Sequence, residues 1–327
     1  MQDTQLGERG PRVSRIAFGN WSAGGDWGQV DRDAAIAATR EALALGITLF
    51  DTARAYGFGA AEQLLGEALR PEIQSARESI VLATKGGLRK DGGRTVRDSS
   101  PDALRRDLEA SLRFLDTDYV DIYQVHWPDP ATPITTTAEA LDGFVRDGLV
   151  RFVGVSNYDP AQMRTFEQVR PIDTLQPPYH LFRREIETGI LPFAQEHGIG
   201  VLVYGPMAHG LLSGRMTADT TFSSDDWRSS SDLFTGEAFH RNLAVVRELT
   251  DFAERRGATV AQLAIAWTLA NRAVDVAIVG ARSAEQIRQT APAADLRLTS
   301  EDLAQIESML RSEVAVGGPA PEAMPKR

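Results

Sequence analysis

The sequence predicts an α/β fold in which eight parallel strands close into one (β/α)8 barrel. Short apolar runs alternate with amphipathic stretches of helical length, the alternation repeats eight times, and no linker divides the chain into halves. Because a helical crossover returns each strand in the same direction, the strands are expected to be parallel. We therefore expect residues 1–327 to form a single domain, a TIM barrel.

The predicted strands and helices follow one another along the chain. In order, the strand and helix pairs are RIAFG with DAAIAATREALALG, ITLFD with AAEQLLGEALR, SIVLATK with PDALRRDLEASLRFL, YVDIYQVH with TTTAEALDGFVRDG, VRFVGVS with PAQMRTFEQVR, DTLQP with ETGILPFAQEHG, GVLVYG with NLAVVRELTDFAERRG, and VDVAIVG with SAEQIRQTA. Gly46, Gly148 and Gly198 fall where a helix C-terminus needs a positive φ, and Pro101 and Pro160 suit the first turn of a helix. The segment TQLGERGPRV, before the first strand, is expected to form a hairpin that closes the bottom of the barrel.

Two segments fall outside this alternation. From Gly205 to about Glu237 the chain is rich in Gly, Ser and Asp, and a loop of that length is expected to act as a mobile lid after the seventh strand. The tail, residues 311–327, is expected to be loosely held.

Composition excludes several classes of function. The 35 basic and 45 acidic residues give a net charge of −10, and the basic residues are scattered, which argues against a nucleic-acid partner. The chain has no cysteine and therefore no disulfide, thiolate metal site or thiol nucleophile. The N-terminus lacks the features of a signal peptide, and no run of about 18 apolar residues follows. We expect a cytoplasmic protein with no membrane partner.

Polar or aromatic residues end nearly every predicted strand, where the chemistry of a barrel is located. The residues at these strand ends, two glycines included, are Asn20, Trp21, Asp51, Lys85, His126, Ser156, Asn157, Gln176, Tyr204, Gly205, Gly280 and Arg282. Each residue alone is compatible with a helix cap or a hydrogen-bonded core group. Their convergence on one rim favours a functional site.

Tyr56 follows Asp51 by five residues and suggests acid catalysis. A free phenol, with a pKa of about 10, is a poor acid at neutral pH. Asp51 and Lys85 end neighbouring strands, so the lysine is expected to pair with Asp51 and to lower the pKa of the Tyr56 phenol. His126, at the next strand end, would offer a ring N–H to the same oxygen.

These four residues suit carbonyl reduction, in which oxygen receives a proton and carbon receives a hydride. Since no side chain supplies a hydride, a nicotinamide is required. Ser156, Asn157 and Gln176 are suited to the carboxamide of such a cofactor, and Tyr204 to the face of its ring.

The motifs DTARAYGFGAAEQLLGEAL, ATKGG, IYQVHWP, GVSNY, LQPPYHL and VYGPMAHGLLSG, in this order, resemble the aldo-keto reductase family from Ile16 to Thr290. FGNWSAGG and AYGFG are similar to its bacterial branch of inositol-catabolism and general-stress reductases. The resemblance implies a monomer that uses NADPH without metal. Tyr56 would be the acid, Lys85 and Asp51 would tune it, and His126 would orient the carbonyl.

The resemblance also implies where the cofactor binds. Ser156, Asn157 and Gln176 would hold the carboxamide, and Tyr204 would stack on the ring. Gly205, Pro206, Leu211 and Gly214 correspond to a loop over the pyrophosphate. GARSAEQIRQT, residues 280–290, corresponds to the adenosine end, with Arg282 on the 2′-phosphate and Gln286 near the adenine. Gly280 would allow close backbone approach, and Arg288 is a second candidate for the phosphate. Thr290 departs from the asparagine usual in the family.

Other signals are weaker. GFGAAE, residues 57–62, falls short of the dinucleotide fingerprint because Glu62 replaces the third glycine, which disfavours a doubly wound fold. His126 and Asp129 in HWPDP have no second histidine at ligand spacing, which argues against a metal. Trp21, Phe58 and Trp127 are expected near the substrate, although packing at the barrel top explains them equally well.

The leading hypothesis is NADPH-dependent reduction of an aldehyde or ketone to an alcohol. A second is oxidation of a sugar or polyol, because the same site runs in both directions. A third, from another class, is a slow-turnover NADP(H)-sensing scaffold subunit, against which the complete set of four residues argues. The physiological substrate stays open.

Overall fold

The structure is a computed structural model that describes residues 1–25, 30–223 and 226–310. Its central element is a closed barrel in which neighbouring strands all pair in parallel. The strands are β3 (Ile16–Gly19), β4 (Leu49–Asp51), β5 (Val81–Gly86), β8 (Val120–Val125), β9 (Val150–Ser156), β10 (Thr174–Gln176), β11 (Gly200–Tyr204) and β12 (Val276–Gly280). β12 pairs with β3, with Gly280 opposite Gly19, which completes the ring. The predicted fold class is confirmed.

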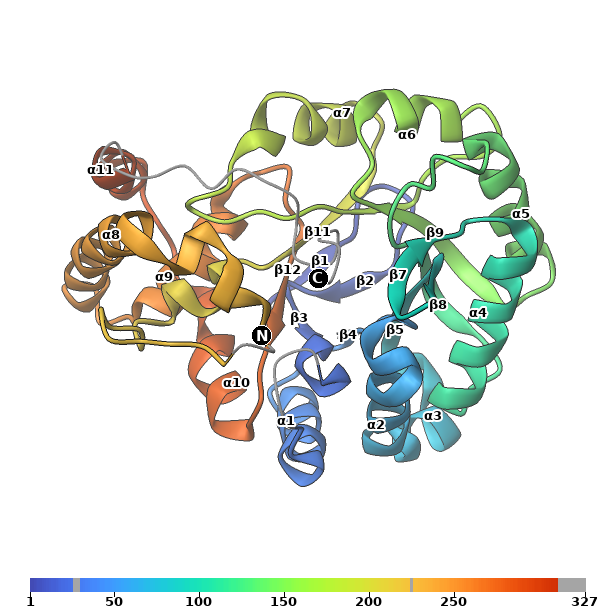
Figure 1. The fold of residues 1–327 in the computed structure, drawn as a ribbon, viewed down its shortest axis with the longest axis horizontal. Helices are drawn as coiled ribbons and strands as arrows, with labels where there is room; N and C mark the ends of the chain where they lie inside the picture. Colours follow the sequence, from blue (N-terminus) through green and yellow to red (C-terminus); the bar gives the residue numbers. More distant parts are fainter. Residues whose placement is uncertain (26–29, 224–225, 311–327) are drawn as a thin grey trace.

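Helices surround the barrel (Figure 1). The α-helices are α1 (Arg32–Ala44), α2 (Ala60–Ala68), α3 (Arg70–Ser75), α4 (Pro101–Leu115), α5 (Ile134–Arg146), α6 (Pro160–Phe166), α7 (Ile190–Glu196), α8 (Gly236–Glu254), α9 (Val260–Ala270), α10 (Ala284–Thr290) and α11 (Ser300–Leu310). Short 3-10 helices are η1 (Trp21–Gly24), η2 (Tyr56–Gly59), η3 (Arg77–Ser79), η4 (Glu185–Thr188), η5 (Ala208–Ser213), η6 (Trp227–Ser230), η7 (Asp232–Phe234) and η8 (Ala291–Asp295). Every predicted strand and helix pair has a counterpart here.

The expected N-terminal hairpin is present as β1 (Asp3–Gln5) and β2 (Arg12–Ser14), which pair antiparallel. Figure 1 shows these strands near the middle of the ring of helices. Leu6 and Val13 are buried in the same apolar cluster as the inward-facing Leu49 and Ile122. The hairpin therefore closes one end of the barrel by burying apolar side chains against its interior.

Local sequence explains the helix boundaries. Pro101 and Pro160 occupy the first turns of α4 and α6, where a missing N–H is tolerated. The glycines that follow three helices have positive φ: 82° at Gly46, 76° at Gly148 and 63° at Gly198. Both expectations are confirmed. The positive φ values of the three glycines let the chain turn directly from each helix into the next strand.

The structure differs from the sequence-based expectations in two places. A second hairpin, β6 (Leu88–Asp91) with β7 (Arg94–Arg97), follows β5 and was not predicted. Its turn signal, two glycines at 92 and 93 with φ of 52° and 84°, lies between polar residues rather than alternating apolar ones. Helix α8 begins at Gly236 instead of Asn242, because Phe239 buries its ring and extends the apolar face.

The segment predicted as a lid, residues 205–237, contains η5, η6 and η7 and the start of α8. It contributes Leu211, Leu212 and Phe234 to the main core. Residues 224–225 and the predicted loose tail, residues 311–327, lie outside the described residues. Lid mobility and a single independent domain stay predictions. Among the described residues, no helix combines the length and the apolarity needed to cross a membrane.

Candidate active site

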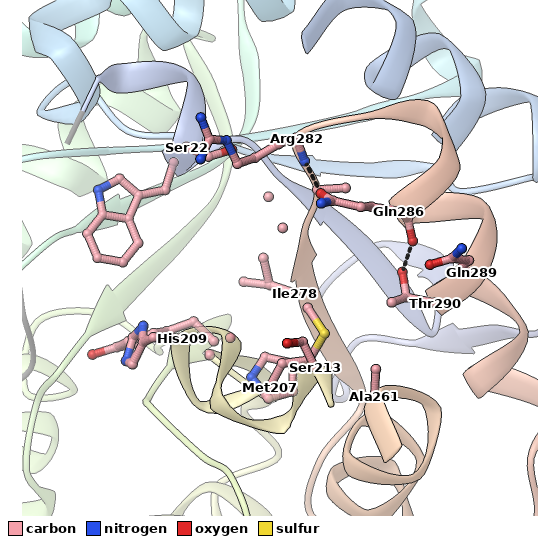
Figure 2. A pocket seen from close by; sticks show the side chains of 18 of the residues that line it. Ser22, Met207, His209, Ser213, Ala261, Ile278, Arg282, Gln286, Gln289 and Thr290 are labelled. Atoms are coloured by element: carbon pink, nitrogen blue, oxygen red, sulfur yellow. Dashed lines mark hydrogen bonds between the residues drawn. The ribbon is translucent and has the colours of Figure 1, made fainter. Parts of the chain in front are cut away.

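A pocket of about 380 Å³ opens where several barrel strands end. Its lining includes Asp51 from β4, Gln176 from β10, Tyr204 from β11 and Gly280 from β12. The segment after β11 supplies a second wall, and Figure 2 shows Met207 and His209 from this segment across the pocket from Arg282 and Gln286. The carboxyl ends of β4, β10, β11 and β12 thus face one pocket.

Lys85 contacts both Tyr56, the predicted acid, and the carboxylate of Asp51. Its ammonium Nζ lies 2.7 Å from Asp51 Oδ2 and 3.4 Å from the Tyr56 hydroxyl oxygen, and it also donates to the carbonyl of Thr52 at 2.9 Å. Lys85 is 1% exposed and Asp51 is 3% exposed. Because β4 and β5 are neighbours in the barrel, the predicted pairing is present, and the two charges neutralise one another away from water.

The backbone around Tyr56 is tightly packed. Tyr56 begins η2, in which Gly57 and Phe58 have left-handed φ values of 61° and 49°. A Cβ at Gly57 would lie 2.6 Å from the carbonyl oxygen of Gly24 in η1, so only glycine fits there. Trp21, also in η1, stacks on the Tyr56 ring with centroids 6.0 Å apart. The Tyr56 ring is therefore held against Trp21, and Tyr56 also lines the pocket.

His126 follows β8 and meets the same cluster. Its ring contacts the Tyr56 ring edge-on at 5.7 Å. Burial, and secondarily the positive charge of Lys85, hold the pKa of His126 well below its usual value. The imidazole is therefore neutral at neutral pH. Its Nδ1 has no hydrogen-bond partner among the described residues.

A chain of buried amides crosses the barrel interior. Gln176 Nε2 donates to Asp51 Oδ1 and to Gln124 Oε1, both at 2.9 Å. Gln124 in turn donates to Thr174 at 3.1 Å. This leaves the carbonyl oxygen of the Gln176 side chain as the polar atom that a ligand in the pocket can engage. Sequence analysis missed Gln124, although an amide inside the apolar run YVDIYQVH was a usable signal.

Ser156 and Asn157 lie behind this amide rather than in the pocket lining. Ser156 Oγ donates to the carbonyl of Gln176 at 2.8 Å. Asn157 Nδ2 donates to the carbonyl of His126 at 3.0 Å, and Asn157 Oδ1 accepts from the Tyr204 hydroxyl at 3.0 Å. In this structure the two side chains tie β9 to β8, β10 and β11.

The predicted cofactor loop divides into lining and supporting residues. Tyr204, Gly205 and Pro206 line the pocket. Leu211 is fully buried in the main core. Gly214 has a φ of 73°, and a Cβ there would lie 2.9 Å from Val260. Leu211 and Gly214 therefore shape the segment from beneath.

Arg282 and Gln286 form another part of the pocket (Figure 2). The backbone N–H of Arg282 donates to Gln286 Oε1 at 2.7 Å, which orients the Gln286 side chain. Thr290 lines the pocket too, but its hydroxyl donates to the carbonyl of Gln286 at 3.0 Å. A Cβ at Gly280 would come no closer than 3.6 Å to any other residue, so the glycine leaves room in the pocket.

Arg288 lies outside this lining. It contacts Glu41 at 3.0 Å and Glu285 at 2.7 Å on the surface of α1 and α10. Because Arg288 does not line the pocket and Arg282 does, Arg288 is the weaker of the two arginines proposed for a phosphate.

Several lining residues were not predicted. His209 has a left-handed φ of 54° and lies edge-on to Trp21 at 6.1 Å and to Trp227 at 5.0 Å. Burial is the main cause that lowers the pKa of His209 to about 3. Arg215 donates to Gln289 Oε1 at 3.0 Å and so joins the segment after η5 to α10 across the pocket. Tertiary packing decides that His209 and Arg215 line the pocket. The only sequence signal was that Arg215 directly follows Gly214, which was predicted to be near the cofactor.

The three aromatic residues expected near the substrate lie in different surroundings. Trp21 lines the pocket. Phe58 lies under the Lys90 ammonium, 4.9 Å from the ring centroid, and Trp127 lies under the Arg97 guanidinium at 4.8 Å. Neither Phe58 nor Trp127 lines this pocket, so their contact with a substrate stays a prediction.

Asp129 has a structural role in HWPDP. Its carboxylate accepts from the backbone of Ser99 and Ala131 and from the hydroxyl of Thr132. Over the residues that the structure describes, no three His, Asp or Glu side chains gather as ligands for one metal ion.

Comparisons with known proteins decide the family. The model of the aldo/keto reductase family matches residues 15–311 of the chain. This chain belongs to the aldo/keto reductase family. The resemblance inferred from its motifs is confirmed.

Individual aldo/keto reductases resemble the chain over nearly its whole length. Aldo-keto reductase YhdN of Bacillus subtilis is 39% identical, with 96% of this chain and 95% of that protein covered. The NADH-specific methylglyoxal reductase of Escherichia coli is 32% identical, with 94% and 98% covered. The structure of the glycerol dehydrogenase AKR11B4 from Gluconobacter oxydans superimposes with a TM-score of 0.88 at 38% identity, with 97% of each chain covered. The protein is thus an oxidoreductase of a family that uses nicotinamide cofactors.

Proposed function

We propose that this protein reduces the carbonyl of a small aldehyde or ketone to an alcohol, with NADPH as cofactor and Tyr56 as proton donor. The observation that carries the proposal is the line of contacts from Asp51 through Lys85 to Tyr56, at 2.7 Å and 3.4 Å, beside the pocket. A phenol beside a buried ammonium is suited to give up a proton, because the positive charge stabilises the phenolate that remains.

Each residue of this cluster has one part in the reaction. Tyr56 transfers its hydroxyl proton to the carbonyl oxygen, and the O–H bond of the product forms as that of Tyr56 breaks. A bound reduced nicotinamide supplies the hydride that reaches the carbonyl carbon. Lys85 stabilises the tyrosinate, and Asp51 holds the lysine in place. Neutral His126 donates a ring N–H to the carbonyl oxygen and orients it.

The pocket suits a nicotinamide dinucleotide by the chemistry of its lining. The side-chain carbonyl of Gln176 can accept from the carboxamide, the Tyr204 ring offers a face for stacking, and Arg282 offers a guanidinium for a 2′-phosphate. Ser156 and Asn157 support this end through the contacts described above. The preference for NADPH is a proposal, because the similar Escherichia coli reductase is by its name NADH-specific.

A second candidate is the reverse reaction, oxidation of a polyol. It is favoured by the likeness to a glycerol dehydrogenase that covers 97% of both chains. In this direction the Tyr56 phenolate accepts the hydroxyl proton of the alcohol, and the same cluster serves. We further propose a cytoplasmic monomer that acts on small carbonyl or sugar-like substrates.

The test is turnover in both directions. The purified protein is mixed with NADPH and a panel of aldehydes that includes glyceraldehyde and a nitrobenzaldehyde. Oxidation of NADPH should appear as a fall in its absorbance at about 340 nm. Glycerol and sugars with NADP⁺ provide the reverse assay. Saturable cofactor binding without turnover in either direction would refute the proposed function and favour the sensing role.

A further inference from the structure

A group of charged residues, one of them fully buried and two half-buried, lies on the outer side of β5, behind Lys85. It consists of Arg54, from the segment between β4 and η2, Glu62 from α2 and Asp107 from α4; we call it the outer charge cluster. Glu62 is 0% exposed. Burial raises the pKa values of Glu62 and Asp107, and the positive charge of Arg54 acts in the opposite direction on both. The charge of Arg54 thus favours the ionised form of both carboxylates.

The two carboxylates hold the strand on both sides of Lys85. Successive side chains of a strand point to opposite faces, so Thr84 points outward while Lys85 points into the barrel. Thr84 Oγ1 donates to Glu62 Oε1 at 2.7 Å. The backbone N–H of Gly87 donates to Asp107 Oδ2 at 2.9 Å. Thr84, just before Lys85, is therefore attached to α2, and Gly87, two residues after it, is attached to α4.

Arg54 attaches the segment that carries Tyr56 to the same place. Its backbone N–H donates to the carbonyl of Lys85 at 3.0 Å. Its guanidinium lies over two rings, 5.8 Å from the centroid of Phe58 and 5.3 Å from that of Phe114. Phe58 is the residue with the left-handed φ of 49°, a conformation that costs free energy in a non-glycine residue. The stacking favours that conformation two residues after Tyr56.

These contacts have no part in the reaction described above, since none of the three charged side chains lines the pocket. Arg54 Nε and Nη1 and Glu62 Oε2 are buried without a hydrogen-bond partner among the described residues. Buried polar atoms without a hydrogen bond cost free energy, so the cluster is not explained as a simple device for stability.

We propose that the outer charge cluster is a positioning device that sets the distance between the Lys85 ammonium and the Tyr56 hydroxyl. Arg54, Glu62 and Asp107 act through Lys85 and Tyr56 and touch neither substrate nor cofactor. This inference rests on the proposed function, because the distance matters only if Tyr56 is the proton donor.

The test replaces Arg54 by methionine, which keeps the apolar stem and removes the charge. A misplacement of about 1 Å at a reacting group can cost about 100-fold in rate, so kcat of Arg54→Met should fall about 10- to 100-fold. KM for a neutral aldehyde and the dissociation constant for NADPH should change less than about threefold, because the pocket lining is intact.

Arg170→Met is the matched control at the other end of the barrel. Arg170 pairs with Asp173 at 2.9 Å, and Asp173 accepts from the backbone of Val153, so this pair also attaches a strand through a buried carboxylate. Both variants are expected to lower the melting temperature, but only Arg54→Met should lower kcat. Equal kcat in the two variants, or a loss in both, would overturn the positioning role.

Two further measurements keep the inference testable. If Arg54→Met does not fold, Thr84→Val removes one hydroxyl at nearly constant shape, and its kcat should fall about threefold to tenfold; unchanged kcat contradicts the proposal. If the wild-type protein shows no turnover, the proposed function fails, and crystal structures of Arg54→Met and Arg170→Met test the inference alone. Only the first should lengthen the 3.4 Å separation of Lys85 Nζ and the Tyr56 hydroxyl.

Discussion

The ammonium of Lys85 lies 3.4 Å from the hydroxyl oxygen of Tyr56, and both residues are buried. Asp51 contacts the same ammonium at 2.7 Å, so Lys85 connects a carboxylate buried in the barrel to a phenol that lines the pocket. A proposed catalytic tyrosine needs such a contact and a packing tyrosine does not, and the first prediction distinguishes the two roles.

Tyr56→Phe should reduce turnover by about 100- to 10,000-fold, because it removes the proposed proton donor and keeps the ring that packs with Trp21. Melting temperature and NADPH affinity should change little. Tyr179→Phe is the control: its hydroxyl donates to Glu187 Oε1 at 2.6 Å, so its loss should cost about 1.5–3 kcal/mol of stability and leave kcat intact. A stable Tyr56→Phe protein with normal turnover would exclude Tyr56 as the acid.

Lys85→Met should abolish turnover and destabilise the protein. Removing one partner of a buried ion pair leaves the other charge uncompensated, at a cost of about 3–5 kcal/mol. The double variant Lys85→Met/Asp51→Asn removes both charges and keeps an acceptor for Gln176, so urea unfolding should show most of the stability restored. Its turnover should stay lost. Recovery of activity along with stability would mean that Lys85 serves only the fold.

Arg282→Ala should weaken NADPH binding about 10- to 100-fold and leave NADH binding nearly unchanged. Hydrogen bonds to a charged group contribute about 1.5–3 kcal/mol, and only NADPH carries the 2′-phosphate. Arg288→Ala, which removes an arginine that pairs with Glu41 and Glu285, is the matched control and should alter neither affinity. Fluorescence titration with both cofactors measures this. Equal losses for NADPH and NADH in Arg282→Ala would show that Arg282 does not recognise the phosphate.

His209 should make stability depend on pH. Its pKa is about 3 in the folded protein and about 6.5 in an unfolded chain. Between these values the unfolded state binds one more proton, so the contribution of His209 to stability is present above about pH 6.5 and is lost as the pH falls.

His209→Asn should therefore reduce this dependence. Between pH 7 and pH 5 the wild type should lose about 2 kcal/mol more of its free energy of unfolding than the variant, as measured by urea denaturation. Asparagine tolerates the left-handed backbone at this position. Buried carboxylates with raised pKa values, such as Asp173 and Asp275, act in the opposite direction but equally in both proteins. Identical pH dependence would contradict the assignment.

The sequence alone determined the order of strands and helices and the position of the residues at strand ends. Periodicity of apolar residues placed all eight barrel strands, since burial of a strand or of a helix face leaves a regular pattern along the chain. It also predicted the pairing of Asp51 with Lys85, because consecutive strands of a barrel are neighbours in space.

Only the tertiary structure decided which side chains face the pocket and which support it. Ser156 and Asn157 end a strand as predicted but hydrogen-bond to neighbouring strands, whereas His209 and Arg215 reach the pocket from a segment without a regular pattern. The outer charge cluster joins residues 54, 62 and 107. In the sequence alone, these charged residues look like those of any solvent-exposed surface. The physical reason is that the spacing of apolar residues along the chain indicates which face of a helix or strand is buried. The direction of each polar side chain and its contacts depend on how several helices and strands pack together.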